Sequence, residues 1–379
     1  MSHGESQGDG WRAIPIVGAV VACGCMIVGW NWDICWHRSI GRDTVWTLPH
    51  IAIYVALALA FVYNAILVLS FTFGARKDTP AIRVLGFRAP GGAFVTLWGI
   101  LLQFMAILFD DWWHGIYGLD IGVFSPPHAL LAWGIGIFYL GQFVLVATLR
   151  NQTAPRREAQ TRWALLLIAA FLIGHFSLAM DASYGPRAVR THAWMITSAT
   201  WAPFALLLSR IVIGRKSASV WAAAFYMLFV ISLMQIFRQF PASPTFGPVF
   251  HRIDHFLPPP FPMALIVPAA AMTWAYGIGN LGRWKRAALV AVVFLVSFHA
   301  TNWATSAFLM SPAAENAIFG GIYPGAYFEE TYRPVKEMTF GGGGALVASL
   351  KSTGIAFLAA TGMLWVAQTF GDWLKRVVR

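Results

Sequence analysis

The stretch from residue 33 to residue 50, DICWHRSIGRDTVWTLPH, joins the end of one apolar run to the start of the next. Asp33 and His37 are four residues apart, so on a helix they share one face. His50 lies thirteen residues after His37 and directly after Pro49, a residue well suited to the first turn of a helix. A tight helical hairpin would therefore bring one carboxylate and two imidazoles together, which is the geometry of a metal site.

The composition around this stretch is that of a membrane protein. Of the 379 residues, 58% are hydrophobic and 11% are charged, whereas soluble domains carry about 25% charged residues. The apolar runs long enough to cross a bilayer lie near residues 12–32, 48–73, 92–110, 126–149, 163–182, 191–213, 218–238, 261–281, 286–308 and 345–370. We therefore expect an all-α, polytopic integral membrane protein with about ten transmembrane helices.

The net charge of +11 is explained by the distribution of basic residues. Arginine and lysine concentrate in alternate connections and at the C-terminus, and most acidic residues lie in the other connections. The positive-inside rule then puts both termini in the cytoplasm and arranges the spans as five hairpins with tips on the extracytoplasmic face. We expect a multi-pass protein of the cell inner (cytoplasmic) membrane, surrounded by membrane lipids, and nucleic acid is not needed to explain the charge.

Histidines gather on one side of this expected topology. The hairpin tips hold His37, His50, His114, His128, His192, His251 and His255. His175 and His299 lie somewhat deeper, in the outer halves of their spans, and only His3 is cytoplasmic. Imidazole favours membrane interfaces in general, so some of these residues are expected to be simple interfacial ones.

The second hairpin repeats the pattern of the first. Asp110 and His114 are again four residues apart, and His128 follows fourteen residues later, directly after a proline. Both copies place a tryptophan immediately before the first histidine. A third hairpin keeps only Asp181 and His192. The chain therefore carries the ligand pattern twice.

Two copies of one pattern favour metal binding over the alternative. A single Asp-x3-His can be an interfacial hydrogen bond or ion pair, but carboxylates near the hydrocarbon zone are costly unless they are paired or bind a cation. One carboxylate and two imidazoles suit copper, zinc or iron. Ligand type alone leaves these three metals open.

The first copy resembles the copper-site segment of the membrane C subunit of the particulate methane and ammonia monooxygenases. That segment has Asp-x3-His-x12-His, with Arg-Asp-Thr between the two histidines. The resemblance implies that Asp33, His37 and His50 hold a catalytic copper ion. It also implies that Arg42 and Asp43 orient a ligand or line the site.

The second copy resembles a neighbouring site of the same subunit, which has Asn-x3-His-x13-His. On that resemblance Asp110, His114 and His128 hold a second metal ion, with aspartate where the family has asparagine, so that this site carries an additional negative charge. The resemblance covers roughly residues 30–145. The chain thus divides into metal-site hairpins over residues 1–150 and a remainder that we do not recognise.

That remainder, residues 151–379, is expected to form further transmembrane helices. It carries two longer extracytoplasmic loops, at 239–260 and 309–344, and loops of this size on a compact protein tend to be caps or docking surfaces.

Two functions of different classes follow. The first is copper- and O2-dependent oxidation of a small apolar substrate (a hydrocarbon) or of ammonia. It requires an external electron donor, and other monooxygenase-type subunits or further copies of the chain are the expected partners. The second is a non-enzymatic membrane protein that binds copper for storage, delivery or transport. Zinc or a pair of iron ions in the same hairpins is a third possibility.

Overall fold

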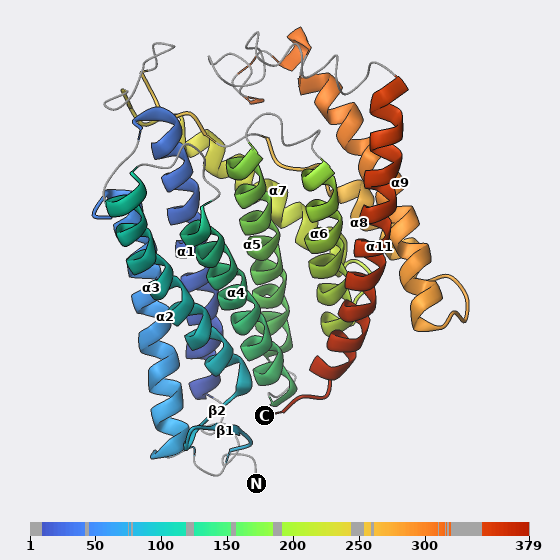
Figure 1. Ribbon diagram of the computed structural model, residues 1–379. Coiled ribbons are helices and arrows are strands. Elements are labelled where there is room, and N and C mark those ends of the chain that lie inside the picture. Colours follow the sequence, from blue (N-terminus) through green and yellow to red (C-terminus); the bar gives the residue numbers. More distant parts are fainter. Residues whose placement is uncertain are drawn as a thin grey trace.

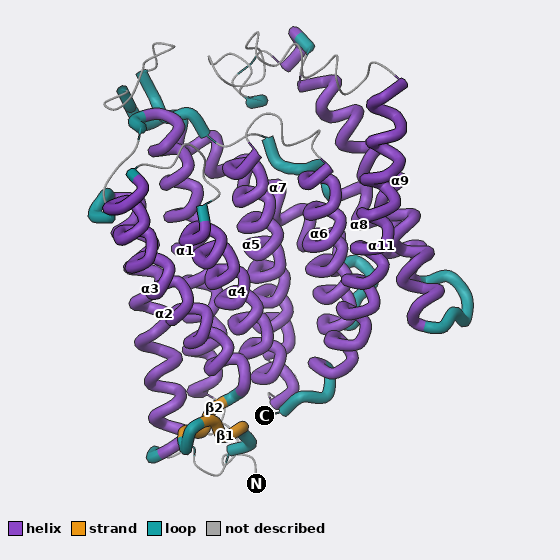
Figure 2. Tube along the Cα trace, viewed as in Figure 1, coloured by secondary structure: helices purple, strands orange, loops and turns teal. Residues whose placement is uncertain are grey.

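The computed structural model describes residues 10–41, 45–74, 76, 79–118, 125–152, 157–184, 192–243, 254–258, 261–309, 311–314, 316, 318–319 and 343–378. About 80% of the structure is helical, and long helices dominate the views in Figures 1 and 2. The all-α architecture expected from the sequence is confirmed.

A helix lies at the position of each of the ten apolar runs. The helices are α1 (Ala13–Ser39), α2 (Leu48–Thr72), α3 (Gly91–Tyr117), α4 (Pro126–Gln152), α5 (Glu158–Tyr184), α6 (His192–Ile213), α7 (Ala218–Phe237), α8 (Ile266–Tyr276), α9 (Arg283–Leu309) and α11 (Gly343–Leu374). The described residues also form two 3-10 turns, Gly10–Arg12 and Pro312–Ala314, and the antiparallel strands β1 (Ile82–Val84) and β2 (Phe87–Ala89).

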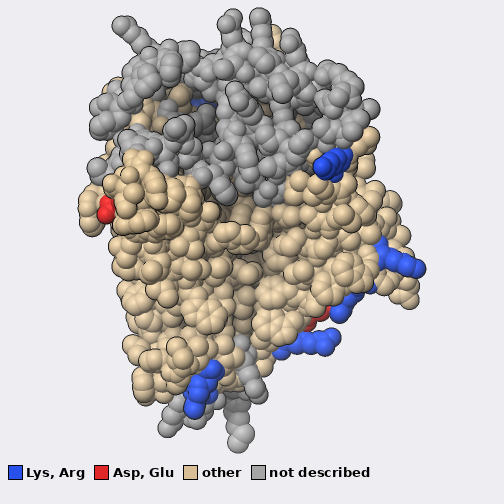
Figure 3. Space-filling model, in the orientation of Figure 1, with Lys and Arg blue, Asp and Glu red and all other residues tan. Residues whose placement is uncertain are grey.

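Eight helices among the described residues are long and apolar enough to cross a membrane. They are α1 to α5, α7, α9 and the part of α11 that begins at Leu350. Figure 3 shows a broad tan surface with few charged side chains; the blue Lys and Arg atoms on this face lie at its lower left and along its right side. The protein is therefore a multi-pass membrane protein.

Local chemistry sets the helix ends that matter for the candidate ligands. Helix α2 begins at Leu48 with Pro49 in its first turn, as the sequence predicts. Helix α3 ends at Gly118, whose φ of 75° is a conformation that glycine adopts at low cost. The Gly118 N–H donates to the carbonyl of His114 at 3.1 Å. The chain therefore turns close to the candidate histidines.

The first four helices pack as antiparallel neighbours. Helix α1 contacts α2, α4 and α5, while α3 contacts α2 and makes its most extensive contact with α4. The α1–α2 and α3–α4 connections therefore lie at one end of this bundle. The two chain termini and the β1–β2 hairpin lie at the opposite end (Figure 1).

Glycines allow α3 and α4 to approach closely. A Cβ atom on Gly99 would lie 2.5 Å from the backbone nitrogen of Phe138, and one on Gly141 would lie 2.4 Å from that of Thr96. No side chain fits at such distances unless the helices move apart, and small residues are what allow membrane helices this contact. The separation of α3 and α4 therefore depends on these glycines.

Replacing Gly99 or Gly141 with alanine is expected to lower the free energy of unfolding by about 1–3 kcal/mol, because backbone atoms must shift to accept the new methyl group. Thermal unfolding of the purified protein in detergent measures the loss. The matched control is Gly362→Ala in α11, where a Cβ meets nothing within 4 Å. Equal losses in the control and the two test variants would contradict the close contact.

One apolar run is helical over only part of its length. The run expected at residues 261–281 forms α8 over Ile266–Tyr276, and residues 261–265 have no regular secondary structure. The prolines just before α8 explain the difference, because Pro262 and those preceding it lack the N–H that a helix needs.

Candidate metal centre

Asp33, His37 and His50 converge where α1 ends and α2 begins. The Oδ1 atom of Asp33 lies 3.6 Å from Nε2 of His37 and 3.2 Å from Nε2 of His50. One potential ligand atom from each of the three side chains lies within 4.8 Å of the other two. The hairpin thus brings together the three residues that the sequence predicts. We call this set the first cluster.

The geometry of the first cluster fits a bound metal ion. The Asp33 side chain is 7% exposed, and its Oδ1 atom is buried without a hydrogen bond from the described residues. Such an oxygen costs free energy unless a cation compensates it. Ligand atoms around a tetrahedral ion with bonds of about 2.0–2.1 Å are about 3.3 Å apart. The 3.2 and 3.6 Å separations are close to that spacing.

Neighbouring side chains orient His50. Its ring stacks on Tyr54, one turn further along α2, with centroids 6.3 Å apart and an interplanar angle of 28°. The Tyr54 hydroxyl donates to the carbonyl of Val45 at 2.9 Å, which ties the α1–α2 connection to α2. Arg42 and Asp43, the residues expected to orient a ligand, lie outside the described residues.

Asp110, His114 and His128 form a second cluster at the α3–α4 connection. The Oδ1 atom of Asp110 lies 3.5 Å from Nε2 of His114 and 3.8 Å from Nε2 of His128. This oxygen is also buried without a hydrogen bond from the described residues. The three side chains are 24–27% exposed, so the second cluster is wider and more open than the first.

Hydrogen bonds to the other ring nitrogens direct the imidazoles of the second cluster. Nδ1 of His114 donates to the Gly118 carbonyl at 3.0 Å, because a carbonyl oxygen only accepts. In a neutral His114 ring, Nε2 therefore carries the lone pair, and it faces the Asp110 carboxylate. Nδ1 of His128 is bonded to the Ser125 hydroxyl at 2.8 Å. A lone pair facing a carboxylate is repulsive, and a cation between them removes the repulsion.

The two clusters lie at the same end of the α1–α4 bundle. Helix α1 packs on α4, and α2 packs on α3. The imidazole of His128 is close enough to Asp33 for the two groups to interact electrostatically. The two hairpins therefore place both sets of candidate ligands in one region of the protein.

His175 of α5 lies directly below this region and was assigned no specific role from the sequence. It is fully buried, and its Nε2 donates to the carbonyl of Ala132, one turn after His128. Its ring centroid is 6.0 Å from that of Trp30, one turn before Asp33. His175 therefore fixes α5 against the two helices that carry ligands of both clusters. An isolated polar residue within an apolar run is the only signal in the sequence that marks it.

The other singled-out histidines do not extend the clusters within the described residues. His255 pairs with the adjacent Asp254. His299 lies in α9, away from both hairpins. The side chains of Asp181 and His192, the third copy of the pattern, lie outside the described part of the structure, as does all of His251.

Comparison with known proteins identifies no relative, since no family model, no curated protein and no solved structure matches the chain.

Substituting Asp33 with asparagine distinguishes a ligand from a structural ion pair. If Asp33 is kept as a ligand, Asp33→Asn should change the unfolding free energy of metal-free protein by less than about 1 kcal/mol, because the substitution removes a buried charge that no metal ion compensates. Breaking a structural buried pair would instead cost about 3–5 kcal/mol. Thermal unfolding in a chelator measures the difference, and Asp110→Asn is the matched variant in the second cluster.

Proposed function

We propose that the protein is a copper-binding membrane protein of the particulate monooxygenase type, which uses O2 to oxidise a small apolar substrate (a hydrocarbon) or ammonia. The observation that carries the proposal is the pair of buried carboxylate oxygens, each within 3.2–3.8 Å of two imidazole nitrogens. This donor set accepts copper, zinc or iron. The resemblance of residues 30–145 to the monooxygenase C subunit selects copper.

The residues of the first cluster would hold the ion, and the bound copper would supply the reaction with O2. Asp33 contributes a negative charge from a buried position, and His50 keeps its orientation through Tyr54. The surrounding apolar helices let a substrate arrive through the membrane. Inserting one oxygen atom and reducing the other to water consumes two electrons and two protons, so an external electron donor is required.

The proposed topology has about ten spans in five hairpins, in the inner membrane, with both termini in the cytoplasm. The alternation of basic connections along the sequence supports it. So does the position of both termini at one end of the bundle, opposite the α1–α2 connection (Figure 1). Both clusters would then lie towards the extracytoplasmic side. Large hydrophobic side chains exposed on α2 and α3 would contact lipid, other monooxygenase-type subunits or further copies of the chain.

Substitution of the ligands should remove copper one ion at a time. Asp33→Ala or His37→Ala is expected to lose the ion of the first cluster, and Asp110→Ala the ion of the second, because each removes one of three ligands. Metal analysis of the purified variants gives the copper count, and electron paramagnetic resonance reports the nitrogen ligands. His255→Ala is the control, since His255 pairs with Asp254 and belongs to neither cluster. Unchanged copper in Asp33→Ala and His37→Ala would eliminate the first site.

The oxygenase activity is tested with copper-loaded protein, a reductant and a panel of alkanes, alkenes and ammonia. Label from 18O2 should appear in the product, and Asp33→Ala should reduce the yield at least about a hundredfold, because without copper the O2 chemistry is lost. Bound copper without any O2-dependent product would reject the oxygenase and leave the second candidate.

The second candidate is a non-enzymatic protein for copper storage, delivery or transport. The open second cluster favours it, because side chains that are about a quarter exposed would let an ion exchange with solvent. Copper accumulation by cells that express the protein, compared with cells that express Asp110→Ala, tests this candidate. Equal accumulation in the two strains would count against it.

A further inference from the structure

Helix α8 is too short to cross the membrane, and the chain that leads into it is not helical. Its 11 residues span about 16 Å, roughly half of a hydrocarbon core of ~30 Å. Pro268 lies in its first turn, where proline is tolerated. Residues 261–265, directly before it, have no regular secondary structure. Non-helical backbone at membrane depth occurs only where protein surrounds it or where it lines a cavity.

Side chains of neighbouring helices satisfy this unwound segment. The N–H of Met263 donates to the Tyr226 hydroxyl of α7 at 3.0 Å, and the N–H of Ala264 donates to Oδ1 of Asn302 in α9 at 3.1 Å. Tyr226 is also bonded to the Ser177 hydroxyl of α5 at 2.8 Å. Side chains from three helices therefore hold the segment in its non-helical form.

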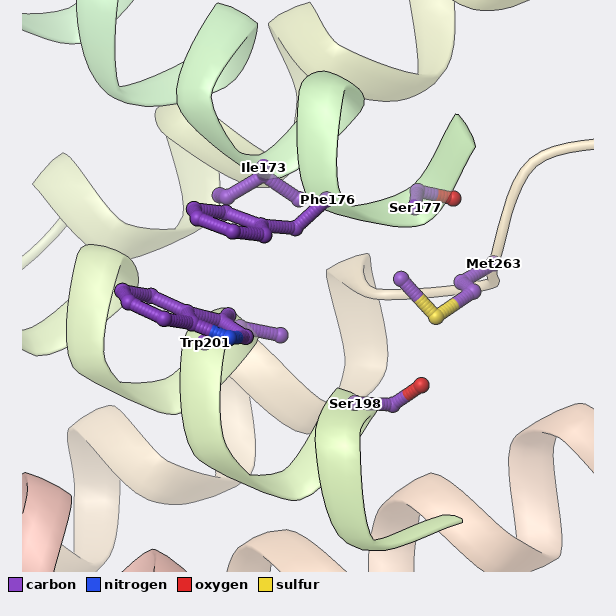
Figure 4. A pocket seen from close by; sticks show the side chains of 7 residues that line it. Ile173, Phe176, Ser177, Ser198, Trp201 and Met263 are labelled. Atoms are coloured by element: carbon purple, nitrogen blue, oxygen red, sulfur yellow. The ribbon is translucent and has the colours of Figure 1, made fainter. Parts of the chain in front are cut away.

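A narrow cavity lies where the unwound segment meets α5 and α6. Its lining residues are Ile173, Phe176, Ser177, Ser198, Trp201, Ala202 and Met263. Figure 4 shows the two serines on different helices, with the Met263 side chain beside them and the Phe176 ring parallel to that of Trp201. The empty volume of the cavity is about 230 Å³, but this value includes its open mouth and the gaps between atoms. The space that a molecule can occupy is much smaller and holds about one water-sized molecule.

The wall of the cavity is mostly apolar and carries one hydroxyl, that of Ser198, without a hydrogen-bond partner among the described residues. Phe176 and Trp201 stack with ring centroids 3.9 Å apart and an interplanar angle of 6°. Ser198 is 5% exposed, and its hydroxyl lines the cavity without a hydrogen-bond partner among the described residues. A buried hydroxyl in this state costs about 1–3 kcal/mol, which a bound hydrogen-bonding molecule would recover.

The cavity wall is connected to the helices that carry the clusters. His175, which contacts α1 and α4, is followed by Phe176, which lines the cavity. On α4, Trp133 packs edge-on against Trp201, with centroids 5.6 Å apart. None of the cluster ligands lines the cavity.

We propose that this cavity binds a small neutral molecule of about one or two non-hydrogen atoms that carries one O–H or N–H group, such as methanol. The Ser198 hydroxyl forms the hydrogen bond, and the rings and Met263 contact the apolar part. No lining residue is charged, so an ion would find no partner. The inference does not depend on the metal proposed above.

The test uses protein labelled with 5-fluorotryptophan and titrated with methanol. The fluorine resonance of Trp201 is assigned by its disappearance in Trp201→Phe, and it should shift saturably. Ser198→Ala should raise the apparent Kd about threefold to tenfold, because one hydrogen bond is lost. Ala202→Val should abolish the saturable shift, because two methyl groups fill the space. Ser232→Ala on α7, where the hydroxyl is exposed, is the matched control.

Each possible outcome decides the inference. Asp33→Ala should leave the methanol titration unchanged, which separates this site from the metal proposal. A linear shift shared by other tryptophans would be a solvent effect and would overturn the inference. So would the absence of any shift, which would leave an ordered water as the only occupant. A shift that xenon reproduces and Ser198→Ala does not weaken would define an apolar void instead.

Discussion

The structure depends on one constraint: inside a membrane, every backbone N–H and carbonyl must find a partner within the protein. Eight long apolar helices meet it internally. Among the described residues the segment 261–265 departs from this pattern, since prolines prevent a helix there and the hydroxyl of Tyr226 and the amide oxygen of Asn302 accept backbone N–H groups. The candidate metal clusters lie at helix ends, and the small cavity lies beside this break.

In both clusters a buried carboxylate oxygen lies close to two imidazole nitrogens. Asp33 and Asp110 each direct a buried oxygen at two imidazole nitrogens, yet neither oxygen receives a hydrogen bond from the described residues. In a neutral His114 ring whose Nδ1 atom donates to Gly118, the lone pair on Nε2 faces the carboxylate. A cation between the two groups removes this repulsion, and copper is the ion that we propose.

Helix α5 connects the helices of the two clusters with the second half of the chain. One side of this helix presents His175 to α1 and α4, and the next two residues, Phe176 and Ser177, line the cavity towards α6. Measured along the helices at about 1.5 Å per residue, Asp33 lies about 9 Å before the end of α1 and Ser177 about 10.5 Å before the end of α5. Helix α5 thus contacts the helices of the clusters and also lines the cavity.

The sequence by itself determined the all-α membrane architecture, the position of each helix and the two sets of candidate ligands. It could do so because hydropathy over about 20 residues and the four-residue spacing of Asp and His are local properties. Only the tertiary structure decided that the carboxylate oxygens lack hydrogen bonds, that His175 lies beneath both clusters, and that the run at 261–281 is helical over barely half its length. Ser198 was not distinguishable in the sequence, because its burial and its unused hydroxyl arise from contacts among α5, α6 and Met263. Such contacts join residues far apart in the chain, and no local pattern encodes them.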